Sequence, residues 1–242
     1  MSACPSIRAR TCAFALTMLI SLTSWSHESI TTEARKGYLS TLLQAQQMLA
    51  SQAAPAAKAQ ALFQLGSTLD EIRDLFNQDI ISHGAVKGLE STLLLNELER
   101  NGFKPQMSPK IGLYLSQLNN YRSALKLDSK APFKDRAKYL LLKNQFYDSF
   151  TDNPLTPLSQ TREELSELLA IGESLLDAKE PVANPEEVRF ILAIHYLQAV
   201  QQQLIPKEDG NRKFKKLQAE LRKDYPQSLK PLTLEALAPS SP

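Results

Sequence analysis

Three histidines, His27, His83 and His195, are the side chains of this sequence best suited to proton transfer or metal binding near neutral pH. His83 follows Asp79 by four residues, a spacing that places both side chains on one face of a helix, as a metal pair or an acid/base pair. The same spacing fits a histidine at a helix C-terminus that interacts with the helix dipole and a nearby carboxylate. We favour this structural interpretation, because no further ligand spacing accompanies the two residues.

A second candidate site lies in an apolar stretch, residues 188–200, in which 10 of 13 side chains are apolar. At about 100° per residue, His195, Gln198 and Gln202 fall within about 60° of one another. This narrow polar stripe could line a concave binding groove. A solvent edge or a hydrogen-bonded interior histidine explains the same residues, and we favour that interpretation.

A basic stretch, residues 207–223, carries seven basic and three acidic side chains. A local surface of this charge could contact anionic lipid or glycan. The solvated outer face of a helix predicts the same residues and is the preferred interpretation. The candidate basic surface consists of Arg212, Lys213, Lys215 and Lys216.

Catalytic chemistry of other kinds finds little support in the sequence. Nucleophilic catalysis needs an activated hydroxyl beside a base, and no Gly-x-Ser-x-Gly element is present. Loops that cradle phosphate need glycines in series, whereas the chain has eight glycines in total. Paired carboxylates such as Glu163 and Glu164 fit first helical turns, where negative charge meets the helix dipole favourably. We therefore expect no enzyme activity, no cofactor and no metal.

The first residues have the order of a secretory signal peptide. Arg8 and Arg10 precede an apolar run, residues 12–22, which is shorter than the roughly 20 residues that span a bilayer as a helix. Small residues at positions 24 and 26 predict cleavage after Ser26. Cys12 stands at the start of the apolar run instead of after it, so we expect no lipoprotein anchor.

Removal of this signal peptide, residues 1–26, changes the composition of the chain. It takes away Cys4 and Cys12, the only cysteines, so the mature chain has no disulfide or thiolate site. It also takes away two arginines and no acidic residue, which lowers the net charge from +2 to zero. We expect a periplasmic or secreted protein that has no integral membrane span in its mature chain and does not bind nucleic acid.

Leucine occurs 40 times, valine 4 times and glycine 8 times, a composition that favours helix over strand and turn. Amphipathic patterns separated by short connections predict an all-α protein of antiparallel helical hairpins, stacked as a short solenoid or packed as an irregular bundle. Hairpins are expected over residues 27–150 and 161–238. Residues 151–160 form the candidate hinge loop, and residues 239–242 a tail.

Individual helices are predicted from their start and stop signals. The expected helices cover residues 29–52, 55–83, 85–101, 109–125, 132–150, 161–176, 185–200, 211–225 and 232–237. Thr161 and Glu164 have the spacing of a capping box, and Asn184 with Pro185 repeats a start signal. His83 and Gly84 are expected to break the chain between two helices, and Gly102 is expected to end a helix as a left-handed cap.

The C-terminal quarter combines an apolar helix, Phe190-Ile-Leu-Ala-Ile-His-Tyr-Leu, with a second helix that begins near Phe214 and ends in the step Tyr225-Pro-Gln-Ser. Residues 185–238 resemble the tetratricopeptide-type repeats of bacterial envelope-assembly and cell-division accessory proteins. In those repeats a Tyr-Pro-x-Ser sequence often ends the second helix and leads into the next hairpin. The resemblance implies a helical-hairpin architecture and partner binding.

Three functional hypotheses follow. The first is a non-enzymatic helical scaffold or interaction module of the bacterial cell envelope, with another envelope protein or a peptide as its partner. The second is a small-ligand or metal-binding protein, or an enzyme, with a site around Asp79 and His83 or around His195. The third is a structural subunit of a larger complex.

Overall fold

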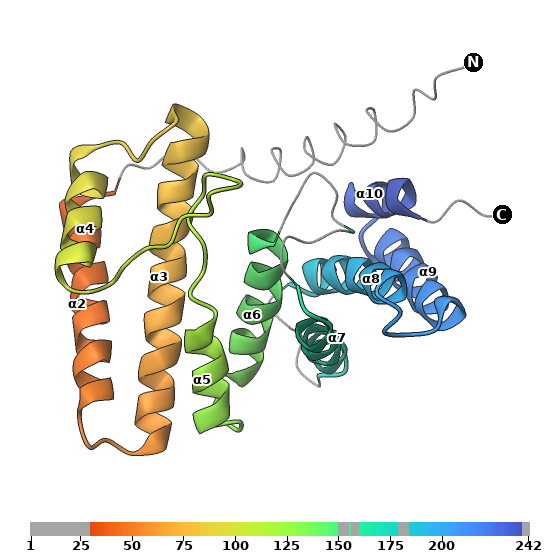
Figure 1. Ribbon diagram of the computed structural model, residues 1–242, viewed down its shortest axis with the longest axis horizontal. Coiled ribbons are helices and arrows are strands. Elements are labelled where there is room, and N and C mark those ends of the chain that lie inside the picture. The colour runs from red at the N-terminus through yellow and green to blue at the C-terminus, as the bar shows by residue number, and fades with distance from the viewer. Residues whose placement is uncertain (1–29, 150–154, 156–159, 179–183, 239–242) are drawn as a thin grey trace. The chain divides into compact units, whose positions relative to one another are not determined.

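The computed structural model describes residues 30–149, 155, 160–178 and 184–238, and in this part of the chain the regular secondary structure is helical (Figure 1). The all-α prediction is therefore confirmed. The predicted signal peptide with its cut after Ser26, most of the hinge loop 151–160 and the tail 239–242 lie outside the described residues.

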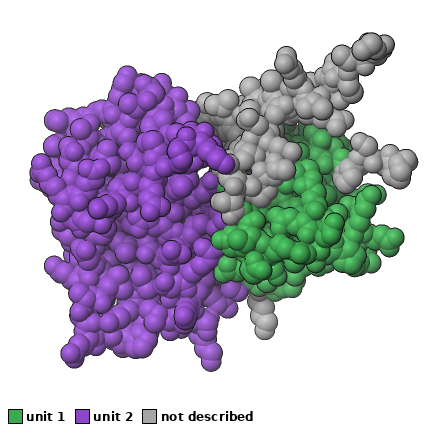
Figure 2. All heavy atoms as spheres, viewed as in Figure 1, with its two compact units in different colours: residues 1–25, 149–242 green, residues 26–148 purple. Residues whose placement is uncertain are grey.

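The chain divides into two compact units, with the boundary between Asp148 and Ser149. We call residues 30–148 the N-terminal unit and the described residues from 149 onward the C-terminal unit; Figure 2 draws them in purple and green.

The N-terminal unit contains five helices, which are α2 (Thr32–Ala50), α3 (Pro55–His83), α4 (Leu89–Arg100), α5 (Asn119–Leu127) and α6 (Lys134–Asp148). Helix α2 packs on α3 and α4, and α5 packs on α3 and α6. Pro55 occupies the first turn of α3, and Gly84 ends that helix with a φ of 79°. The core under α2, α3 and α4 is made by Leu42, Leu69, Ile72, Phe76, Leu94, Leu98 and Phe103.

The described C-terminal unit contains α7 (Arg162–Leu176), α8 (Pro185–Gln201), α9 (Lys207–Asp224) and α10 (Lys230–Leu237). Thr161 and Glu164 form the predicted capping box, and the side chain of Asn184 accepts the N–H of Glu187. Helix α8 packs against α7, α9 and α10. It is buried along nearly its whole length, as its apolar sequence predicts.

The predicted helix over residues 109–125 is wrong in its first half. Residues 106–116 form a small hairpin, in which Met107 and Tyr114 make an antiparallel β-bridge and Gly112 turns the chain with a φ of 68°. The N–H of Ser108 donates to Leu113 at 2.8 Å, and the N–H of Leu115 donates to Gln106 at 2.7 Å. We call this segment the 106–116 hairpin.

Two other helix starts differ from the prediction by four residues. Helix α4 begins at Leu89 instead of residue 85, because Gly88 has a φ of 90°, which a right-handed helix does not allow. Helix α9 begins at Lys207, so Gly210 lies inside it.

Gly210 lies at the closest approach of α9 to α8, where a Cβ atom would stand 2.2 Å from Cγ2 of Val200. We expect Gly210→Ala to lower the free energy of unfolding of the C-terminal unit by about 1–3 kcal/mol, because a stiff side chain must move. The matched control is Gly37→Ala in α2, where nothing lies within 4 Å of the new Cβ. This substitution should stabilise by up to about 1 kcal/mol, since alanine is the better helix former. Urea denaturation measures both, and equal effects of the two substitutions would refute the close contact.

Candidate functional site

Asp79 and His83 lie on one face of the last turns of α3, as their spacing predicts. The carboxylate of Asp79 is buried and accepts the backbone N–H of Lys87 at 3.2 Å, so it holds the connection that follows the helix. His83 is the exposed last residue of α3. Among the residues that the structure describes, no group of three or more histidine, cysteine or acidic side chains is placed to hold a metal ion.

His195 and Gln198 do not line an open groove. Their side chains are 0% and 2% exposed, and Nδ1 of His195 lies 2.6 Å from Oε1 of Gln198. Gln202, the third residue of the predicted stripe, is half-buried and ends α8. Burial lowers the pKa of His195 to about 4, although the hydrogen bond to Gln198 opposes the shift. His195 is therefore a neutral interior histidine at pH 7.

The four residues of the candidate basic surface lie on α9, and acidic partners accompany three of them. Arg212 pairs with Asp209 at 2.7 Å, and Lys216 lies 3.9 Å from Glu220. Nζ of Lys213 is 2.6 Å from Glu173 and 4.8 Å from the ring centroid of Tyr196. Lys215 is exposed.

Tyr196 also belongs to this contact between α7, α8 and α9. Its hydroxyl donates to the same Glu173 carboxylate that receives Lys213. Burial, together with that hydrogen bond, raises the pKa of Tyr196 to about 12. The hydrogen bond from Lys213 lowers the pKa of Glu173. Glu173 therefore ties two neighbouring helices together as an ionised carboxylate.

The most unusual polar site of the described residues is a buried charge cluster that joins α3, α5 and α6. The guanidinium of Arg73 lies 3.3 Å from the carboxylate of Asp70 and 3.8 Å from that of Asp148. The hydroxyl of Tyr121 and the amide of Asn144 both donate to Asp70. We call these five residues the Arg73 cluster. Its hydrogen bonds and ion pairs join the three helices into one unit.

Burial dominates the ionisation of this cluster. It raises the pKa of Asp70 to about 6, although Arg73 and the Tyr121 hydroxyl oppose the shift. Burial also raises the pKa of Asp148, again against the charge of Arg73. The pKa of Tyr121 is raised by burial and by the neighbouring Asp70 carboxylate, which keeps its hydroxyl protonated as a donor. Arg73 thus opposes the effect of burial on both carboxylates.

The 106–116 hairpin is anchored on this cluster and on α3. The side-chain amide of Asn77 donates to the carbonyl of Tyr114 at 2.9 Å and accepts its N–H at 2.7 Å, as a neighbouring strand would. The backbone N–H of Ser116 donates to Asp148 at 2.8 Å. The ring of Tyr114 packs at a tilt on that of Phe76, with centroids 5.7 Å apart.

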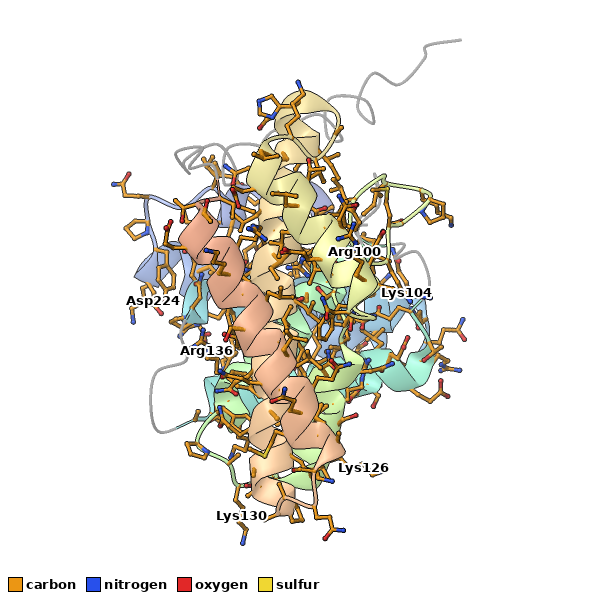
Figure 3. All side chains as sticks on the ribbon, turned by 90° about the vertical axis from the view of Figure 1, so that its left-hand side faces the viewer. Arg100, Lys104, Lys126, Lys130, Arg136 and Asp224 are labelled. Carbon is orange, nitrogen blue, oxygen red and sulfur yellow. The ribbon has the colours of Figure 1, made fainter. Side chains whose placement is uncertain are left out.

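A narrow cleft opens between α3, the end of α4 and the hairpin, with an empty volume of about 320 Å³ when its open side is included. Its walls are apolar, and Arg73 and Gln117 are its polar members. The apolar lining consists of Leu69, Ile72, Phe76, Leu98, Pro105, Tyr114 and Leu115. Figure 3 views this unit with its side chains and labels Arg100 and Lys104, which precede cleft residue Pro105 in the chain.

The sequence pattern predicted neither the Arg73 cluster nor the cleft. One signal was present, since Asp70 falls beside Leu69 on the apolar face of α3 and Arg73 follows it by three residues. A carboxylate at a core position needs a partner, and the i, i+3 arginine is one. The remaining members come from α5 and α6, and only the fold brings them to Asp70.

The sequence matches no protein-family model, and no curated protein or solved structure matches it. No described helix is both long enough and apolar enough to cross a bilayer. The resemblance of residues 185–238 to tetratricopeptide-type repeats therefore stays a prediction.

Proposed function

We propose that this protein is an exported, non-enzymatic interaction module of the cell envelope that binds an extended apolar segment of another protein. The single observation that carries the proposal is the apolar cleft of which the 106–116 hairpin forms one wall. Export rests on the predicted signal peptide, and the bacterial envelope on the resemblance of the C-terminal helices.

One edge of the hairpin forms no backbone pairing with the residues that the structure describes. Hydrogen bonds join the pairs 106–115 and 108–113, so the backbone N–H and carbonyl of Tyr114 point away from Met107. Both groups form hydrogen bonds with the side chain of Asn77. The same alternation directs the N–H and carbonyl of Met107 to the opposite edge. Met107 is 48% exposed. A partner strand can add to such an edge by backbone pairing.

The cleft supplies what backbone pairing alone lacks, which is a preference for side chains. Its aliphatic and aromatic walls offer an apolar contact surface, and the thioether of Met107 adapts to different apolar partners. Alternate side chains of an extended peptide point to one face, so they can lie against this apolar surface while the backbone pairs. The preferred partner is an extended segment with large apolar residues at alternate positions.

Selection from a library of short displayed peptides tests this proposal. We expect enrichment of extended sequences with alternating large apolar residues, and at least tenfold weaker binding to Met107→Pro. Proline removes the N–H of the exposed edge, while the inner pairs 106–115 and 108–113 keep their donors. Circular dichroism and a thermal scan establish that the variant is folded.

Leu89→Ala is the matched control, because Leu89 is 73% exposed at the start of α4 and lies outside the cleft lining. It should bind the selected peptides as the unchanged protein does. Failure to enrich any peptide class, or equal binding by a folded Met107→Pro variant, would count against the proposal.

A further inference from the structure

The outer face of α9 concentrates positive charge. The helix carries seven basic and four acidic side chains, a net charge of +3. Its buried stripe consists of Gly210, Phe214, Leu217 and Leu221. At about 100° per residue the opposite face is about 120° wide and contains one exposed acidic residue, Glu208, with five exposed basic residues, Arg212, Lys215, Lys216, Arg222 and Lys223.

Acidic neighbours cancel only part of this charge. Arg189 of α8 forms an ion pair with Asp224 at 3.6 Å. It also pairs with Glu220 at 3.3 Å, and the same Glu220 pairs with Lys216. Within the described ranges, Lys215 and Lys223 form no ion pair. The outer face of α9 therefore keeps an excess of cations that a partner of opposite charge can use.

Exposed leucines lie next to this face. Leu229, the residue that precedes α10, and Leu232, in the first turn of α10, are 46% and 58% exposed and lie three residues apart. Arg222 of α9 forms an ion pair with Glu235, which lies three residues after Leu232 on α10. That ion pair places the last turn of α9 beside the exposed side of α10.

We propose that α9 and α10 form a surface by which this protein docks on a lipid bilayer with anionic phosphate headgroups. The cations of α9 are complementary to the headgroup charge, and the two leucines enter the boundary between headgroups and acyl chains. This goes beyond peptide binding, because it uses the C-terminal unit and gives the protein a location. The docking is peripheral, with α8, α9 and α10 folded as described.

The combination of charges with leucines decides between a bilayer and a soluble polyanion. A nucleic acid or other soluble polyanion is bound through its charges and gains little from exposed leucines. A bilayer offers an apolar layer a few ångströms beneath its charged surface, so both kinds of side chain contribute. We call Arg212, Lys215, Lys216, Arg222, Lys223, Leu229 and Leu232 the α9–α10 surface.

Vesicle co-sedimentation of the full chain tests the charge contribution. We expect binding to vesicles of phosphatidylcholine with phosphatidylglycerol, weaker binding to phosphatidylcholine alone, and a decrease with added salt. Lys215→Gln with Lys223→Gln should lower the partition coefficient roughly 25-fold. The matched control is Lys126→Gln with Lys130→Gln, two exposed lysines of the N-terminal unit that Figure 3 labels. Residues 1–29 are the same in every variant, so their own affinity for lipid cancels in the comparison.

A second pair of variants tests the apolar contribution. Leu229→Ala with Leu232→Ala keeps every charge and should lower the partition coefficient roughly tenfold. Leu89→Ala, in the other unit, should leave it unchanged. The proposal is overturned if the two lysine pairs behave alike, or if the leucine pair binds vesicles as the unchanged protein does. Loss of heparin binding in the lysine variant, with no effect of the leucines, would assign the surface to a soluble polyanion instead.

Discussion

Replacing Arg73 with methionine should lower the free energy of unfolding of the N-terminal unit by about 3–5 kcal/mol, because the change leaves buried carboxylates without their counter-charge. Asp70 and Asp148 both lie within 4 Å of the Arg73 guanidinium. Methionine fills a similar volume, so the effect reports on charge more than on packing. Urea denaturation, monitored through the hydrogen exchange of the α5 and α6 backbone amides, measures this change in the free energy of unfolding.

Lys126→Met provides the matched control, since it also removes one positive charge, but at an exposed position of α5. Its effect should stay within about 0.5 kcal/mol. Adding Asp70→Asn to Arg73→Met should recover part of the loss, because the double variant has one unpaired carboxylate fewer. An Arg73→Met variant as stable as the unchanged protein would show that the cluster is neutral to stability.

Acid should destabilise the C-terminal unit through His195. Its pKa is about 4 in the folded protein, against 6.5 as the ordinary value, so the unfolded chain binds the proton more tightly. The contribution of His195 is therefore fully favourable above pH 6.5 and decreases as the pH falls toward 4. Over this window we expect a loss of about 3 kcal/mol. Hydrogen exchange of α8 amides at a series of pH values measures it.

His195→Asn isolates this contribution, because the amide nitrogen of asparagine can replace Nδ1 as the partner of Gln198 but does not titrate. Between pH 6.5 and 4, the free energy of unfolding of the variant's C-terminal unit should fall by about 3 kcal/mol less than that of the unchanged protein. Asp70 gives the opposite slope in the N-terminal unit, since its pKa is raised to about 6, but both proteins share that contribution. Parallel pH profiles of the α8 amides would show that His195 does not titrate as expected.

Local signals predicted the helices well. Gly84 ends α3, the Thr161 and Glu164 capping box starts α7, and Asn184 starts α8, because each of these acts within one turn of its own helix. The 106–116 hairpin escaped prediction for the opposite reason. Its apolar spacing fits a helix, but the backbone of Tyr114 is held by Asn77, 37 residues earlier in the chain.

The candidate site shows the same limit. Histidine spacing drew attention to His83 and His195, yet spacing along one helix cannot show whether a side chain meets solvent or a neighbouring helix. The Arg73 cluster depends on Asn144, which is 74 residues from Asp70. Only its first ion pair, Asp70 with Arg73, lies within one helix and could be recognised from the sequence.

The anchoring of the hairpin also has a consequence for the order in which the chain folds. Contacts between α2 and α3 join neighbouring segments, whereas the anchors on Asn77 and Asp148 close loops of 37 and 32 residues. Closing such loops costs entropy before any contact compensates for it. Asp148 is the last residue of its unit. During synthesis, the anchor of Ser116 on Asp148 can therefore form only after the whole N-terminal unit has emerged.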